Sequence, residues 1–344
     1  MPATNADREL IEAAKKGHVE RVRLLLATSD PMAEDSYALR AASQNGHADC
    51  VKMLLPVSDA KAMESFALRA ASQNGHAECV KMLLPVSDSK AEECLALRLA
   101  AFGGHVECVR LLLPVSDAKA EESWALRLAA AYGHIECVRL LLPVSNAKAV
   151  SSEALRMAAR NGHVECVRLL LPVSAPKANN SEALGFAASN GHAECMRLLL
   201  PASNPRAMWS YALRAASGNG HAECVKMLVP VSDAKAEDCH ALRLAARNGH
   251  AECVGMLLPV SGPLGEIDGL LEKVLESGQV NVAALLIEEE PRLLDGVDLS
   301  KCHAAALENN HGNLASCLSS LIEKRELSAM AANAPRQSLA TTRL

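Results

Sequence analysis

The sequence predicts an all-α solenoid, a fold in which short helix pairs stack along one dimension. A Gly-His pair returns every 29 residues, and periods of roughly 20 to 50 residues indicate repeated supersecondary units. The chain is half apolar but only 2% aromatic, so small aliphatic side chains must form a closely packed core, which favours helices over a β-sandwich. The glycines of these pairs are Gly17, Gly46, Gly75, Gly104, Gly133, Gly162, Gly191, Gly220 and Gly249.

The charge distribution disfavours several classes of partner. The 35 basic and 40 acidic residues are interspersed, with a formal net charge of −5, so no basic stripe is available to neutralise phosphates of a nucleic acid. No apolar run reaches the roughly 18 residues of a membrane span, and residues 1–10 lack the basic and apolar regions of a signal peptide. We therefore expect a soluble, cytoplasmic protein that binds neither nucleic acid nor membrane.

Cysteine follows the repeat, which argues against disulfides. In a stacked array neighbouring units lie about 8–10 Å apart. A disulfide needs Cα atoms within about 7 Å, so we expect free thiols in a reducing compartment. The repeating cysteines are Cys50, Cys79, Cys108, Cys137, Cys166, Cys195, Cys224 and Cys253.

Residues 1–29 are expected to form an N-terminal capping repeat. They keep the skeleton of the unit but place Arg21 where later units have cysteine, and Lys15 and Lys16 where later units carry less charge. Terminal repeats need a polar outer face for solubility, and these residues supply one.

Residues 30–261 hold eight near-copies, each predicted to be two short helices around the glycine. That glycine suits the left-handed position after a helix, where a β-carbon is costly. The second helix is expected to begin at the histidine and to stop at a proline, as at Pro56, Pro85 and Pro114, because the residue before proline avoids helical geometry.

The segment before each first helix has two interpretations. Asp30 and its equivalents are good N-cap residues, which favours a long first helix that starts there. Alternatively, a short helical turn precedes a helix that starts near Ser36, Ser65, Ser123 or Ser152. We favour the first interpretation. The segment lacks the alternation of apolar and polar residues that is typical of a β-strand.

The pattern decays after residue 261. Residues 262–324 are expected to form divergent C-terminal capping repeats with helices over 267–277, 280–288, 301–308 and 314–323. Gly278 keeps the 29-residue register, and His311 marks a worn copy of the turn. Residues 325–344 have no apolar period, so a disordered tail is expected.

Three segments of one unit, Leu126–Ala130, Gly133-His134 and Cys137–Leu142, resemble the ankyrin repeat, and the likeness extends over residues 9–320. The resemblance implies stacked helix pairs that bind proteins. The family's Thr-Pro-Leu-His start is absent, and the unit is shorter than the usual ankyrin repeat of about 33 residues. We therefore expect lost or reduced β-hairpin fingers. A generic α-solenoid of another family is the alternative.

The repeated polar columns are expected to be structural. One histidine per unit cannot converge on a metal ion, which needs three or four ligands about 2 Å away, so each histidine should bond neighbouring backbone. Glu107 and Arg110, with their equivalents, are expected to pair on a solvated face. The arginine column of the first helix could hold an acidic ligand, but we expect it to pair with the glutamates of the second helix. These arginines are Arg40, Arg69, Arg98, Arg127, Arg156, Arg214 and Arg243.

No nucleotide-binding or catalytic motif is present, so no catalytic residue, metal or cofactor is predicted. The candidate site is the column that varies between copies, nine residues before the glycine. Aromatic side chains in a row favour interface hot spots, although they could instead fill gaps between units. The candidate anchors are Tyr37, Phe66, Leu95, Trp124, Trp209 and Tyr211, with Glu153, Glu182 and His240 setting specificity.

The predicted function is a scaffold that binds a protein through the concave face of its first helices, without catalysis. The alternatives are a bacterial or viral effector that binds a host protein in the host cytosol, a self-associating structural protein, a redox or metal sensor, and an enzyme in the C-terminal cap. The enzyme would use Lys301, Cys302, His303 and His311. The last three residues, Thr342, Arg343 and Leu344, resemble a ligand of PDZ domains.

Overall fold

A computed structural model describes residues 4–262, 269–289, 297–308 and 311–332, and every regular element in these ranges is a helix. The expected all-α class is confirmed. The chain divides into two compact units, one of Met1–Ala187 with Glu194–Asn204 and one of Ala188–Ala193 with Pro205–Leu344. This division falls within the regular repeats, so the four segments expected from the sequence stay a prediction.

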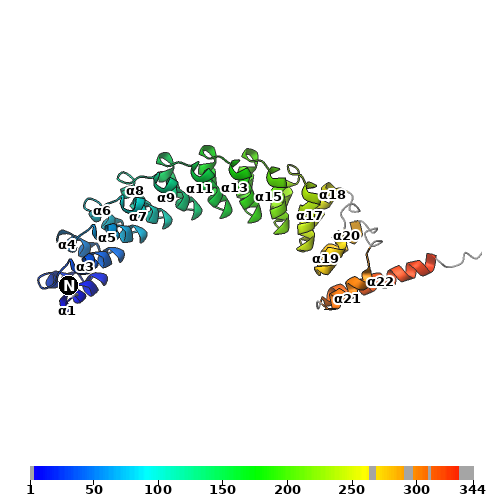
Figure 1. Ribbon diagram of the computed structural model, residues 1–344, viewed down its shortest axis with the longest axis horizontal. Coiled ribbons are helices and arrows are strands. Elements are labelled where there is room, and N and C mark those ends of the chain that lie inside the picture. Colours follow the sequence, from blue (N-terminus) through cyan, green and yellow to red (C-terminus); the bar gives the residue numbers. More distant parts are fainter. Residues whose placement is uncertain (1–3, 263–268, 290–296, 309–310, 333–344) are drawn as a thin grey trace, which may run out of the picture. The chain divides into compact units, whose positions relative to one another are not determined.

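The first unit is a stack of helix pairs that follow one another in chain order (Figure 1). First helices pack on first helices, and second helices pack on second helices. The first helices are α1 (Asn5–Lys15), α3 (Ala33–Gln44), α5 (Ala62–Gln73), α7 (Ala91–Phe102), α9 (Ala120–Ala131) and α11 (Ala149–Arg160). The second helices are α2 (Val19–Leu25), α4 (Ala48–Leu54), α6 (Ala77–Leu83), α8 (Val106–Leu112), α10 (Ile135–Leu141) and α12 (Val164–Leu170). The pair α13 (Ala178–Ser189) and α14 (Ala193–Leu199) contains the division between units.

The second unit repeats the arrangement with α15 (Ala207–Gly218), α16 (Ala222–Leu228), α17 (Ala236–Arg247) and α18 (Ala251–Ser261). Four further helices follow: α19 (Leu270–Glu276), α20 (Val280–Glu289), α21 (Leu299–Glu308) and α22 (Gly312–Ala332). These match the four helices expected after residue 262, with shifted ends. The helix α22 continues to Ala332, so it extends into residues 325–344, for which a disordered tail is expected. Residues 333–344, with the PDZ-like terminus, lie outside the described residues.

The core consists of the small aliphatic side chains that the composition predicts. Leu39, Ala42, Val51 and Leu54, with their equivalents in later units, are fully buried. Burial of each leucine contributes about 1.5–3 kcal/mol, and the alanines let neighbouring first helices approach closely. No unit buries both of its helices alone, so stacking completes the core.

The Gly-His turn connects each unit to the next. Gly46 has φ +75°, and the amide of His47 donates to the carbonyl of Ala42, which ends α3 in a left-handed cap as predicted. The ring of His76, from the next unit, lies where a β-carbon on Gly46 would stand, only 2.4 Å from its Nδ1. Nε2 of His76 donates to the carbonyl of Gln44 over 3.1 Å. The same bond to the backbone of the preceding unit is made by His47, His105, His134, His163, His221 and His250.

The second helices begin at the residue after the histidine and end close to the expected prolines. Ser58 is extended after α4 and a 3₁₀ turn over Leu55–Val57, which contains Pro56. In the last regular unit, α18 continues through Pro259 to Ser261, so the stop at proline does not hold there.

The favoured interpretation of a long first helix is wrong. Glu34, Asp35 and Ser36 have φ between 50° and 58°, a left-handed turn, and right-handed helix is continuous only from the next residue. Asp30 caps a turn instead, since its side chain accepts from the amide of Met32. The same turn recurs at the start of every first helix from α3 to α17. Left-handed geometry costs about 1–2 kcal/mol per residue with a β-carbon, so surrounding contacts must stabilise it.

A buried column at the end of this turn joins adjacent units. The hydroxyl of Ser123 is fully buried and accepts the backbone N–H of Asn146, 23 residues on, over 2.8 Å. Cys94 occupies the same position and accepts from Asp117 over 3.1 Å. The N-terminal cap uses Asp7, whose pKa is lowered because its carboxylate accepts from Thr4 and Asp30. Turn and stacking are therefore coupled through one hydrogen bond per unit.

Gly220→Ala is expected to destabilise the second unit by at least about 2 kcal/mol. The new β-carbon would meet the His250 ring 2.5 Å away at φ +75°. Gly218→Ala, two residues earlier, has its nearest neighbour at 3.5 Å and should be neutral or stabilising by up to about 1 kcal/mol. Chemical denaturation of both variants measures the difference, and equal effects would contradict the packing of His250 on Gly220.

Ser123→Ala should lower the free energy of unfolding by about 0.5–1.5 kcal/mol, because the amide of Asn146 loses its acceptor on the buried Ser123 side chain. Ser123→Cys copies the residue that the chain itself uses at Cys94, so it should cost less. Urea unfolding of the two variants tests this. An alanine variant as stable as wild type would show that this hydrogen bond does not stabilise the stack.

Candidate functional site

The variable column lies at the start of each first helix, directly after the left-handed turn. Tyr37, Trp124 and Tyr211 are 39%, 39% and 36% exposed. The other members, Phe66, Leu95, Glu153, Glu182 and His240, are each half-buried. No described member is fully buried, so the column faces the surface and does not simply fill gaps inside the stack.

In the first unit, arginines of the same helices cover the aromatic members of the column. The guanidinium of Arg40 lies 4.8 Å from the ring centre of Tyr37 and 5.4 Å from that of Phe66, so it bridges two repeats. Arg127 lies 4.4 Å above Trp124. A cation over an aromatic face is stabilised by the ring quadrupole by about 0.5–1 kcal/mol at exposed sites. These contacts restrict the orientations of the rings, which stay part-exposed.

The arginine column has a different role from the one expected. Arg40 donates through Nε to the carbonyl of Asp35 and through Nη2 to that of Glu34. These carbonyls belong to the left-handed turn, and the arginines of the other described repeats contact the same turn. The arginines therefore help to stabilise the strained segment that positions the variable column.

The acidic partners of these arginines also differ from those expected from the sequence. Arg69 pairs with Glu92 at 2.6 Å, and Arg156 pairs with Glu182. Both acids come from the first helix of the next unit, not from the second helices. The second-helix glutamates pair instead with arginines three residues on, as Glu107 does with Arg110 at 3.2 Å, which confirms that exposed pair.

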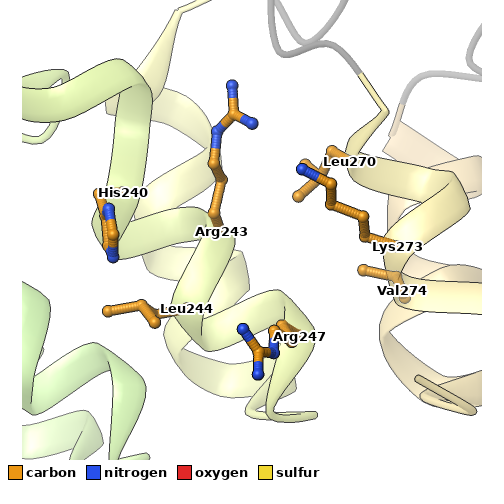
Figure 2. Close-up of a pocket in the computed structure, with 7 residues that line it drawn as sticks. All are labelled: His240, Arg243, Leu244, Arg247, Leu270, Lys273 and Val274. Carbon is orange, nitrogen blue, oxygen red and sulfur yellow. The ribbon is translucent and has the colours of Figure 1, made fainter. Parts of the chain in front are cut away.

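The second unit carries Trp209, Tyr211 and His240. Trp209 is the middle residue of its left-handed turn, with φ 56°, and is 69% exposed. His240 lines a cavity of about 190 Å³ between α17 and α19 (Figure 2). Its Nδ1 lies 3.7 Å from Glu237, which also pairs with Arg214.

Sequence reasoning missed an exposed aromatic pair in the first unit. Phe102 and Tyr132 lie edge to face, with ring centres 4.6 Å apart, at the C-terminal ends of α7 and α9. They are 39% and 52% exposed. Phe102 and Tyr132 fall in neighbouring columns of the repeat. A comparison of one column at a time therefore does not show them as a pair. The signal was available, because Tyr132 replaces the asparagine of most other units.

The histidine and cysteine columns do not converge. Within the described residues no group of three or more potential ligands could hold a metal ion. The cysteines of these ranges are all free, and all but Cys317 are buried. Burial, followed by the neighbouring Glu107, raises the pKa of Cys108 to about 11. Thiols in this state are poor nucleophiles.

The residues that would form an enzyme site in the C-terminal cap lie around separate cavities. A cavity of about 260 Å³ adjoins Cys302 and Lys301, and Glu272, Glu276 and Asp298 also line it. Burial and these three carboxylates raise the pKa of Cys302, the opposite of what a nucleophilic thiol needs. His303 lies 3.0 Å from the hydroxyl of Ser319 and outside the lining of that cavity, and His311 lines another. The four residues do not form one site.

A family model described as ankyrin repeats (3 copies) matches residues 10–92, 68–152, 126–208 and 204–266. Among solved structures, the crystal structure of the human ASB11 ankyrin repeat domain is 25% identical, over 51% of this chain and 95% of that chain, with a TM-score of 0.44. That score is too low for the likeness to carry an argument. No curated protein matches. In the described ranges no helix combines the length and apolarity that crossing a bilayer requires.

The buried thiols should make the protein alkali-sensitive. Seven of them have a folded pKa of about 11, against an ordinary value of 9.0, so they stabilise the fold below pH 9 and lose this effect as the pH rises to 11. The free energy of unfolding should fall steeply over that interval. Denaturation at stepped pH measures it.

Labelling with a thiol reagent at pH 8 tests the burial of the same thiols directly. Half-exposed Cys317 should react first, and the buried column only after urea is added. Rapid native labelling of Cys108 or Cys137 would contradict the burial.

Proposed function

The chain belongs to the ankyrin repeat family, and from that premise we propose that the variable column of its first helices is the surface by which it binds a protein. Ankyrin repeats are in general scaffolds for protein–protein interaction. The observation that carries the proposal is the row of oriented, part-exposed rings of Tyr37, Phe66 and Trp124 beside the arginine column.

Three properties of this row suit an interface. Aromatic residues and arginine are the types most enriched in binding hot spots. The arginine contacts orient the rings in the free protein, so less side-chain freedom is lost on binding. The half-buried Glu153 and Glu182 replace aromatic residues in later copies and pair with Arg127 and Arg156, which changes the local surface from cationic and aromatic to charge-neutralised. A partner that spans several repeats would meet a sequence-specific pattern.

The scaffold would act in a reducing compartment, consistent with the buried free thiols and hence with the cytoplasm of the producing cell or of a host. A translocated effector would use the same surface, and lysates of bacterial and animal cells distinguish the two settings. A self-associating structural protein would instead make the chain its own partner, and light scattering across a range of concentrations tests that alternative.

The triple variant Tyr37→Ala, Phe66→Ala and Trp124→Ala should lose the captured partner. Truncation of a hot-spot residue costs about 2 kcal/mol or more, roughly a 30-fold loss of affinity for each. Affinity capture from lysate, with quantitative mass spectrometry, compares it with wild type.

The matched control is Val57→Ala, Val86→Ala and Val115→Ala. These valines are 46%, 45% and 42% exposed in the same unit, but they follow the second helices. The proposal fails if the aromatic variant, folded by circular dichroism, retains every partner, or if the valine variant loses the same ones.

A further inference from the structure

The cavity between α17 and α19 differs in charge from the regular repeats. One position of the first helix is apolar in all eight copies, and it faces the neighbouring first helix. Gly278, with φ +73°, keeps the register of Gly249, and this register assigns Lys273 of α19 to that position. The apolar residues in the eight copies are Ala41, Ala70, Leu99, Leu128, Met157, Phe186, Ala215 and Leu244.

An equivalent pair of positions earlier in the chain shows what changes when Lys273 stands at this otherwise apolar position. Arg160 lies with its guanidinium 5.5 Å from the ring centre of Phe186 in the next first helix. In the same register, Arg247 of α17 is followed by Lys273 of α19. A cation packed on an aromatic ring is thereby replaced by two cations, which repel each other.

The cavity concentrates positive charge against an apolar wall. Arg243, Arg247 and Lys273 line it with His240, and Leu244, Leu270 and Val274 are the other described lining residues, none of which is acidic. Figure 2 shows Lys273 extending from α19 toward α17, which carries Arg243 and Arg247. This local excess of cations stands in a chain whose net charge is −5.

The side chains of these cationic residues can still donate hydrogen bonds to a ligand. Among the described residues, Arg243 donates its Nε to the carbonyl of Asp238 over 2.8 Å, and neither of its terminal nitrogens has a partner there. Within the described parts of the chain, Arg247 and Lys273 have no ion pair and no side-chain hydrogen bond. Three described acids lie nearby: Glu237 pairs with Arg214 and lies 3.7 Å from Nδ1 of His240, and Glu272 and Glu276 line the separate cavity beside Cys302.

The dimensions restrict the class of ligand. Pockets that enclose whole small molecules measure about 300–1,000 Å³. A cavity of about 190 Å³ accommodates a single acidic side chain and an adjoining apolar group. Such a ligand is presented by a peptide segment that continues outside the cavity.

We propose that the cavity between α17 and α19 binds an acidic segment of a protein partner, with a carboxylate held by Arg243, Arg247 and Lys273 and an aliphatic group on Leu244, Leu270 and Val274. This assignment names the partner chemistry for the second unit and so rests on the proposed function. His240 of the variable column borders the cavity, so one bound segment could contact both.

The probe is a labelled octapeptide of alternating glutamate and leucine, titrated against the full-length protein by fluorescence anisotropy at low salt. The comparison peptide has glutamine for every glutamate. Wild type should bind the glutamate peptide at least about tenfold more tightly, because hydrogen bonds to charged groups are worth about 1.5–3 kcal/mol. The preference should shrink as salt is added.

The test variant is Arg247→Gln with Lys273→Leu, both changes copied from the same columns at Gln44 and Leu244, so the fold should be retained. The control is Arg110→Gln with Arg139→Gln, which removes two positive charges from exposed second helices. The test variant should lose about tenfold in affinity, and the control should stay within about twofold.

The assignment would be overturned by equal binding of the two peptides to wild type, by unchanged binding to the test variant, or by an equal loss in the control. Competition by inorganic phosphate as strong as that by unlabelled peptide would also overturn it, because a simple anion site would then suffice. If partner capture depends on Tyr37, Phe66 and Trp124 while the peptide fails to bind, only the acidic segment is rejected. If the peptide fails to bind and partner capture does not depend on these aromatic residues, the proposed function is rejected as well.

Discussion

The contact between a left-handed glycine and the histidine of the following unit is the constraint on which the stack depends. A side chain at Gly133 would collide with the ring of His163, and that ring in turn bonds the carbonyl of Ala131. The contact fixes both the ending of the first helix and the distance to the next unit. Glycine, histidine and their 29-residue spacing therefore recur through the regular repeats, and Gln279 takes the place of the histidine beside Gly249.

A second constraint acts at the other end of the first helix. The left-handed turn is unfavourable for glutamate, serine or valine, and the fold stabilises it from two sides. The arginine of the same helix donates to the turn's carbonyls, and the buried serine accepts an amide from the next unit. The variable column begins directly after this turn. Its side chains are thus presented from a segment that these contacts hold in most repeats, with Cys94 replacing the serine in one of them.

Periodicity was sufficient to predict the helices, the glycine turn and the buried aliphatic core, because these follow from spacing and residue size. The left-handed turn could not be predicted, since Glu34 and Asp35 have no preference for positive φ strong enough to show in a sequence. The role of Arg40 depends on that turn and was missed with it. Phe102 and Lys273 were missed for another reason: their neighbours come from different units, so only the stacked structure brings them together.

The partners of the arginine column are set by the residues of the next unit. Arg40 is followed by Phe66 and stacks between two rings, whereas Arg156 is followed by Glu182 and forms an ion pair. Both still donate to their own turns, so the structural role is constant while the charge offered at the surface changes. A single substitution in the variable column can therefore convert a cationic, aromatic patch into a neutralised one without disturbing the stack. Near-identical repeats can diversify a binding surface in this way while the contacts that fix their spacing remain unchanged.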